Sequence, residues 1–142
     1  MINYIKKIYF SVWADAINYE RIKNGGEGHW KIFTYSYMTI FMVLNILSLL
    51  SAILFFTGFD MFSSLMLKID KIFLNEKLSN LVWSILVLFI PSMLITYFLV
   101  FYKKKYEYIL NNYSFKNGRF LFIYFMITII CFFGFSFLNK FF

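Results

Sequence analysis

Three long runs of the chain contain no charged residue, and this feature limits the possible folds more than any other. The runs cover residues 32–59, 81–102 and 120–139 and hold 28, 22 and 20 residues. About 20 apolar residues in a helix are enough to cross the hydrocarbon core of a membrane. The chain as a whole is 61% hydrophobic and 15% charged, whereas typical soluble domains are roughly 25% charged. We therefore expect an all-α integral membrane protein with three transmembrane helices, and the composition disfavours both a soluble enzyme and a disordered chain.

The first run is longer than a membrane crossing requires. At 1.5 Å per residue, 28 helical residues extend for roughly 42 Å, against about 30 Å of hydrocarbon. Trp30, Tyr35 and Tyr37 at its start are typical of an interfacial aromatic belt. We expect the helix to begin within the headgroup layer.

The basic residues predict the orientation of a single membrane domain, residues 1–142. With three spans, residues 1–31 share one side of the membrane with the connection 103–119, opposite the connection 60–80 and the C-terminus. The first side holds ten basic residues: Lys6, Lys7, Arg21, Lys23, Lys31, Lys103, Lys104, Lys105, Lys116 and Arg119. The second side holds four: Lys68, Lys71, Lys77 and Lys140. The positive-inside rule places the N-terminus in the cytoplasm and the C-terminus outside. The net charge of +7 then indicates contact with anionic phospholipids rather than with nucleic acid.

Residues 2–23 predict an amphipathic helix that is too charged to cross the membrane and lies on its cytoplasmic surface. Its apolar stripe comprises Ile2, Ile5, Tyr9, Val12, Trp13 and Ala16. Its polar face comprises Asn3, Lys7, Ser11, Asp15, Asn18 and Arg21. Asn24, Gly25 and Gly26 should end the helix, because glycine readily adopts the left-handed cap conformation. We expect an orienting anchor; the alternative is a docking surface for a cytoplasmic partner helix.

The two connections between spans also carry helical patterns. In the connection 60–80, helical spacing predicts a short interfacial helix capped by Asp60 or Ser63. Its apolar positions are Phe62, Leu65, Ile69, Ile72 and Phe73. The inner connection opens with the basic cluster Lys103, Lys104 and Lys105, which we expect to continue the second span as a helix up to residues 111–112. Such a cluster usually faces phospholipids, and the alternative is specific binding of an acidic lipid or partner.

Two features inside the spans are candidates for helix contacts. Asn45, Ser48 and Ala52 form a small and polar stripe, which lets helices approach closely and form hydrogen bonds. We expect this stripe to pack against the other two spans, with an interface to another protein or a second copy as the alternative. Pro91 removes a backbone hydrogen bond and should kink the second span near Val87, more plausibly for packing than for gating.

The sequence contains no recognisable catalytic constellation. The runs lack ionisable Asp, Glu, Lys, Arg and His side chains, which disfavours ion-coupled transporters and proton pumps. The glycine-rich string 25–30 has no flanking phosphate-loop pattern, and His29, the single histidine, has no ligand spacing around it. Cys131 has no nearby activating group in the sequence. We expect no enzyme activity, cofactor or metal.

Two stretches, 8–16 (IYFSVWADA) and 106–118 (YEYILNNYSFKNG), resemble a group of small, uncharacterised three-span bacterial inner-membrane proteins. Asn117-Gly118 resembles the most regular feature of that group, and we interpret it as a turn. The resemblance implies a bacterial inner-membrane location and no known activity.

Two classes of function remain. The first is a non-enzymatic protein that binds another membrane protein, for example as an immunity protein against a membrane-acting toxin or as an accessory protein. The alternative is a membrane effector or channel subunit, for example in antiviral defence. Three spans without charged lining residues cannot enclose an aqueous pore alone, so the alternative requires oligomerisation.

Overall fold

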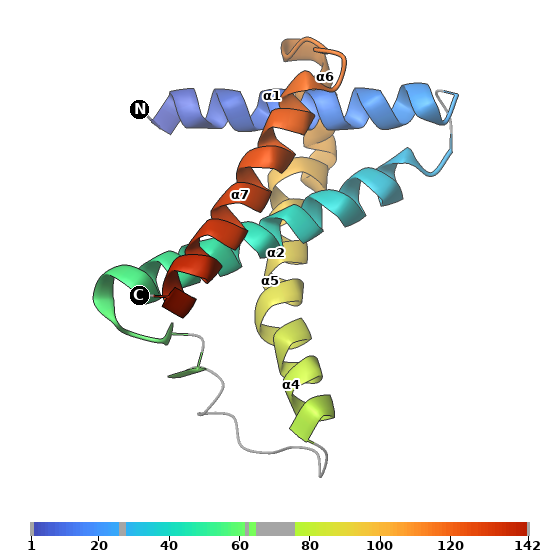
Figure 1. Cartoon of the computed structure of the whole chain (residues 1–142). Coiled ribbons are helices and arrows are strands. Elements are labelled where there is room, and N and C mark those ends of the chain that lie inside the picture. Colours follow the sequence, from blue (N-terminus) through green and yellow to red (C-terminus); the bar gives the residue numbers. More distant parts are fainter. Residues whose placement is uncertain (1, 26–27, 62, 65–75, 142) are drawn as a thin grey trace.

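All regular structure in the described part of the chain is helical. The computed structural model describes residues 2–25, 28–61, 63–64 and 76–141 (Figure 1). The elements are α1 (Ile2–Lys23), α2 (Trp30–Thr57), α4 (Glu76–Ser84), the π-helix η1 (Ile85–Phe89), α5 (Ile90–Thr96), the π-helix η2 (Tyr97–Phe101), the short 3-10 turn η3 (Tyr102–Lys104), α6 (Lys105–Asn112) and α7 (Arg119–Phe141). Three helices are long and apolar enough to cross a membrane. The expected all-α membrane fold with three spans is confirmed.

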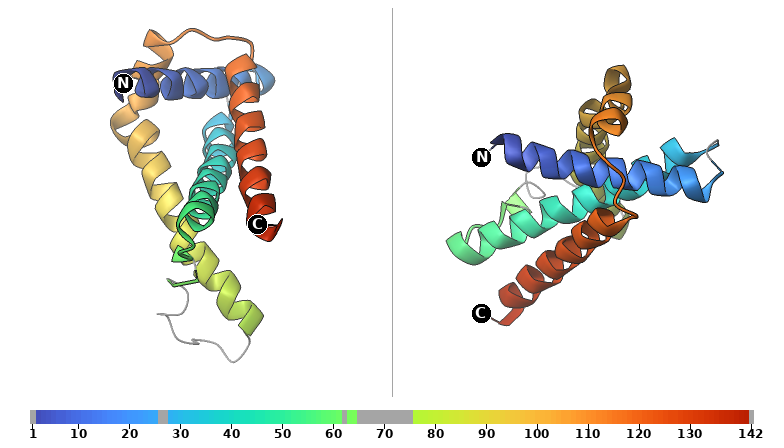
Figure 2. Two further views of the ribbon diagram at one scale, coloured as in Figure 1. Left: turned by 60° about the vertical axis from the view of Figure 1, so that its left-hand side comes forward. Right: turned by 90° about the horizontal axis from the view of Figure 1, so that it is seen from above.

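The three spans form a fan with α2 in the middle. α2 and α7 lie side by side, run in the same direction and share the most extensive contact of the molecule. The second span, built from α4, η1, α5 and η2, packs against α2 through η1 and α5. Its far half diverges from α2 and α7, and α4 extends beyond both (Figure 2).

α1 lies across the ends of the spans and contacts α2, α6 and α7. The connection between α6 and α7 passes over α1 on the side away from the spans (Figure 2). The middle of α1 is therefore enclosed on two sides. Its buried residues are Phe10, Val12, Trp13, Ala14, Asp15, Ala16, Ile17 and Glu20.

The expected helix 2–23 is present, but one of its predicted positions is wrong. Val12, Trp13 and Ala16, from the predicted apolar stripe, are buried. Asp15, expected on the polar face, is completely buried as well. The enclosing connection, which no periodicity in α1 reveals, accounts for the burial of Asp15. The helix ends at Lys23, and Gly25 takes the expected left-handed conformation with φ +70°.

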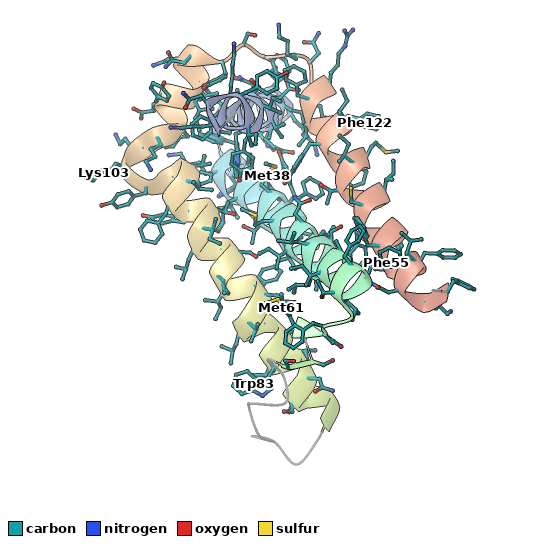
Figure 3. All side chains as sticks on the ribbon, turned by 90° about the vertical axis from the view of Figure 1, so that its left-hand side faces the viewer. Met38, Phe55, Met61, Trp83, Lys103 and Phe122 are labelled. Carbon is teal, nitrogen blue, oxygen red and sulfur yellow. The ribbon has the colours of Figure 1, made fainter. Side chains whose placement is uncertain are left out.

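Within the spans the interior is small and polar while large apolar side chains face outward (Figure 3). Buried polar residues of the spans include Thr34, Thr39, Ser48, Ser92, Thr96 and Thr128. In contrast, Phe122, Ile130 and Phe133 are each more than 60% exposed. Small and polar residues allow close helix approach, and lipid chains cover the outward apolar side chains. This distribution is that of a membrane protein.

The aromatic residues expected in an interfacial belt also contact other helices. Trp30 is buried, and its ring packs edge-on against Tyr106 with 5.6 Å between centroids. The hydroxyl of Tyr35 donates to the carbonyl of Met93 at 2.8 Å, and that of Tyr37 to the carbonyl of Ala16 at 3.2 Å. These rings join α2 to the second span, α6 and α1.

The start of the outer connection has the expected cap at Asp60, and residues 62 and 65–75 lie outside the described part of the chain. α2 ends at Thr57, where Gly58 takes a left-handed conformation and donates its N–H to Leu54 at 2.8 Å. Asp60 accepts the backbone N–H of Ser63 at 2.9 Å, which is the expected capping contact. The predicted apolar positions Phe62, Leu65, Ile69, Ile72 and Phe73 fall on residues 62 and 65–75, outside the described part.

Candidate functional site

The most elaborate polar site is formed around the carboxylate of Asp15. Its Oδ1 accepts the backbone N–H groups of Lys116 at 2.7 Å and Gly118 at 3.1 Å. Its Oδ2 accepts those of Phe120 at 2.9 Å and Leu121 at 3.4 Å. One carboxylate on α1 therefore caps the first turn of α7, whose N–H groups have no partner within their own helix.

The backbone before α7 is shaped to receive an anion. Asn117 and Gly118 both adopt left-handed conformations, with φ of +54° and +76°. Successive N–H groups in such a turn converge into a concave site, and the helix dipole adds positive potential there. A Cβ on Gly118 would meet the ring of Tyr19 at 3.4 Å. We name the Asp15 carboxylate and its four N–H donors the Asp15 clasp.

The clasp connects the two stretches that carry the sequence resemblance, 8–16 and 106–118. Helical periodicity does not predict the clasp, because it places Asp15 on the polar face of α1. One signal was present: Asp15 stands between Trp13-Ala14 and Ala16-Ile17, and a charge among apolar residues needs a buried partner. The predicted turn at Asn117-Gly118 is present, and its function is to present the N–H groups.

The predicted small and polar stripe lies at the interface between α2 and α7. The amide of Asn45 donates to the hydroxyl of Tyr124, and its carbonyl oxygen accepts from the hydroxyl of Thr128 at 3.2 Å. One turn later Ser48 is buried, and Ala52 is half-buried. Because Asn45 is engaged within the chain, it is not available as a contact for a partner.

Pro91 lies directly after a π-helical segment. Ile90 donates its N–H to Ile85, five residues back, so the segment 85–89 is wider than an α-helix. Pro91 itself has no N–H to donate, and the hydroxyl of the next residue, Ser92, donates to the carbonyl of Leu88 at 2.7 Å. The distortion includes Val87, where the sequence predicted a kink.

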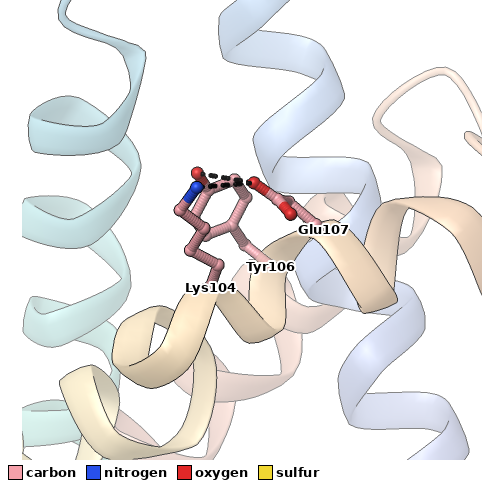
Figure 4. Close-up of polar contacts among 3 residues, drawn as sticks. All are labelled: Lys104, Tyr106 and Glu107. Atoms are coloured by element: carbon pink, nitrogen blue, oxygen red, sulfur yellow. Dashed lines mark hydrogen bonds and ion pairs between the residues drawn. The ribbon is translucent and has the colours of Figure 1, made fainter.

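The basic cluster does not continue the second span as a helix, so that prediction is wrong. Lys103 and Lys104 adopt positive φ angles of 51° and 55°, and α6 begins separately at Lys105. The turn lets α6 pack on α1, and the ammonium of Lys105 reaches back to the carbonyl of Phe98 at 3.0 Å, which suits the negative end of a helix. Lys104 pairs with Glu107 at 3.9 Å beside Tyr106 (Figure 4). Both partners of that pair are more than half exposed, so it contributes little stability.

Two grooves flank the start of α7, one on each side. The first, about 570 Å³, lies beside the N-terminal half of α1, and its basic lining residues are Lys7 and Lys116. The second, about 390 Å³, lies beside the C-terminal part of α1 and is lined by aromatic residues and Glu20. The Asp15 clasp separates them, because it fixes α7 against the centre of α1.

The remaining candidate groups form no site. Cys131 is a half-buried free thiol in α7, and His29 precedes α2 without capping it through a side-chain hydrogen bond. Within the described residues no three His, Cys, Asp or Glu side chains are grouped closely enough to hold a metal ion.

Comparison with known proteins gives no relative. No protein-family model, curated protein or solved structure matches this chain. The fold and the site geometry therefore carry the functional argument alone.

Proposed function

We propose that this chain is a non-enzymatic multi-pass protein that binds another membrane protein within the bilayer, as a toxin-immunity or accessory protein does. The far half of the second span is the proposed contact surface. Among the described residues, this half has one extensive contact with another span, between η1 and α2. Any other contact of α4 or η1 with α1, α2, α6 or α7 is isolated. The exposed large side chains there are Leu78, Leu81, Ile85, Leu86, Phe89 and Ile90.

The π-helix within this surface is the observation that favours recognition over simple lipid contact. A π-helical turn is rare in proteins and frequently lies at a functional site. Here it widens the helix between Ile85 and Phe89 and re-aims the side chains just before Pro91. The exposed apolar side chains of this segment, Ile85 and Phe89 among them, can pack against a helix of another membrane protein. The Asn45 network holds α7 against α2, whereas the far half of the second span diverges from both (Figure 2).

Site-directed photo-crosslinking in native membranes tests this proposal. A photoreactive phenylalanine analogue replaces Phe89 on the proposed surface or, as a control, Ile130 on the outward face of α7. We expect a single membrane-protein adduct from position 89, none from position 130, and loss of the adduct when Pro91→Ala is added. Lipid adducts alone at both positions would refute the proposal. An adduct with a second copy of the chain would favour the oligomerising effector or channel subunit instead.

The location and orientation belong to the same proposal. We place the protein in the bacterial inner membrane with α1 on the cytoplasmic side, supported by the excess of basic residues at that end. Alkaline phosphatase fused after residue 142 should be active, because its fusion point lies outside the cytoplasm. An inactive C-terminal fusion together with an active N-terminal one would reverse the orientation. Expression alone should leave growth and membrane potential unchanged if the protein acts as an immunity protein.

A further inference from the structure

The groove beside the C-terminal part of α1 contains a buried carboxylate surrounded by aromatic rings. Glu20 is 7% exposed and lines this groove of about 390 Å³. Five aromatic side chains line the same groove: Tyr19, Tyr37, Phe41, Phe122 and Phe125. We name this site the Glu20 pocket.

Glu20 accepts fewer hydrogen bonds than Asp15, the other buried carboxylate of α1. Over the described ranges 2–25, 28–61, 63–64 and 76–141, its carboxylate accepts one hydrogen bond, from the amide of Asn24 at 3.2 Å. Asp15, five residues earlier on the same helix, accepts four. A buried carboxylate is stable only with charged or hydrogen-bonding partners, so Glu20 can receive further donors from a ligand in the pocket.

The aromatic walls are held in place by their own packing. Phe41 packs against Phe125 with 5.4 Å between ring centroids and against Tyr37 with 6.0 Å. Tyr37 is fixed from the other side by its hydrogen bond to Ala16. Aromatic faces carry negative potential and attract ammonium groups within about 6 Å. A carboxylate combined with several rings is therefore selective for a cation that has a small apolar part.

A second charge lies next to the pocket. An adjoining hollow shares Asn117, Gly118 and Phe122 with the Glu20 pocket and is also lined by Arg119. The positive guanidinium of Arg119 and the negative carboxylate of Glu20 thus face one continuous surface at the end of the spans. Arg119 starts α7, and Phe122 and Phe125 continue the surface along α7 toward the membrane interior.

We propose that the Glu20 pocket binds the ammonium headgroup of phosphatidylethanolamine. Glu20 and the aromatic rings receive the ammonium group, Arg119 receives the phosphate, and the acyl chains follow the outward face of α7. The opposite charges match a zwitterionic lipid better than an anionic one, because an anionic headgroup would meet the buried Glu20. This lipid site is separate from the proposed protein-binding face on the second span.

Binding of two lipids that differ only in their headgroups tests the proposal. The full chain, purified in detergent, is titrated with phosphatidylethanolamine or phosphatidylglycerol of identical acyl chains, and bound lipid is measured by native mass spectrometry. We expect about tenfold tighter binding of phosphatidylethanolamine. Glu20→Gln should remove this preference, whereas Arg119→Gln should weaken both lipids. The control Glu107→Gln changes an exposed carboxylate outside the pocket and should leave both affinities unchanged.

Three results would overturn the proposal. Equal binding of the two lipids by the unmodified protein would do so, as would an unchanged preference in Glu20→Gln. Displacement of the lipid by free ethanolamine at an equal concentration would indicate a site for a soluble amine instead. If Glu20→Gln does not fold, Phe122→Leu gives the same test, because Phe122 is 63% exposed and its loss removes one wall without opening the bundle. An unchanged preference in Phe122→Leu would then refute the aromatic contribution.

Discussion

Replacing Asp15 should destabilise the protein more than a single change to any other acidic residue whose side chain the structure describes. Asp15→Ala leaves four N–H groups without their acceptor, at Lys116, Gly118, Phe120 and Leu121. The bond to Leu121 is long at 3.4 Å, so we count three strong bonds and one weak one. Each buried N–H that loses its acceptor costs about 1–3 kcal/mol, so we expect a total loss of about 3–5 kcal/mol, to which the lost interaction with the helix dipole contributes.

The size of the effect can be measured by thermal unfolding in detergent. For a chain of this length, a loss of about 3–5 kcal/mol corresponds to a Tm about 10–17 °C lower. Asp15→Asn is the milder variant, because its amide oxygen can still accept two N–H groups while its NH₂ group faces the other two. We expect it to lie between Asp15→Ala and the unmodified protein. The matched control is Glu107→Ala, whose exposed ion pair with Lys104 is worth at most about 1 kcal/mol.

Hydrogen exchange gives a local test of the same reasoning. In Asp15→Asn, the amides of Lys116, Gly118, Phe120 and Leu121 should exchange faster, whereas amides in the centre of α2 should keep their protection. A Tm for Asp15→Ala within about 2 °C of the Glu107→Ala value would show that the clasp does not stabilise the fold. Unchanged exchange at those four amides would lead to the same conclusion.

Three further substitutions test neighbouring parts of the structure by thermal unfolding and spectroscopy. Gly118→Ala should lower the free energy of unfolding by about 1–2 kcal/mol, because φ is +76° there. Gly134→Ala, in open space on α7, should raise it by about 0.5–1 kcal/mol. Equal Tm values for the two variants would contradict this. Asn45→Leu should lower the free energy of unfolding by about 1 kcal/mol, because two interhelical hydrogen bonds are lost. The oligomeric state in detergent should stay unchanged. Dissociation of an oligomer would contradict the placement of Asn45 in a contact within the chain. Pro91→Ala should straighten the second span, and a swing of about 20° would move spin labels between the far ends of α4 and α2 by about 5 Å; an unchanged distance would show that packing alone holds the bend.

The sequence predicted the spans well because membrane insertion depends on local composition. The absence of charge over 20 or more residues requires no knowledge of any neighbour, and the observed helices follow those runs closely. Pro91 is similar, since the loss of an N–H is a property of the residue itself. Asn45 could be recognised as a helix-contact residue, but its actual partners, Tyr124 and Thr128, depend on how the spans are arranged.

The failures share one physical cause, which is a contact between segments far apart in the chain. Asp15 is buried because a connection about 100 residues later crosses α1, and no helical period in α1 contains that information. The second span does not continue as a helix through Lys103 and Lys104, because the chain turns there so that α6 can pack on α1. Trp30 and Tyr35 were expected in an interfacial belt, and their contacts with Tyr106 and Met93 depend on how the helices are arranged. Local patterns identify which segments are helical, and the contacts decide which faces are used.

The two buried carboxylates of α1 indicate what this helix does beyond anchoring. A helix that only lay on the membrane would keep its acids exposed to water, as the amphipathic pattern predicted. Asp15 and Glu20 are both buried instead, and they differ in the way they are satisfied. The four N–H groups around Asp15 leave it little capacity for a ligand, so its role is to position α7. Glu20 has one amide partner and lines a groove with five aromatic residues. The Asp15 clasp fixes the wall of this groove at Gly118. Loosening the clasp should therefore weaken lipid selectivity in the Glu20 pocket as well, a coupling that two independent surface acids would not produce.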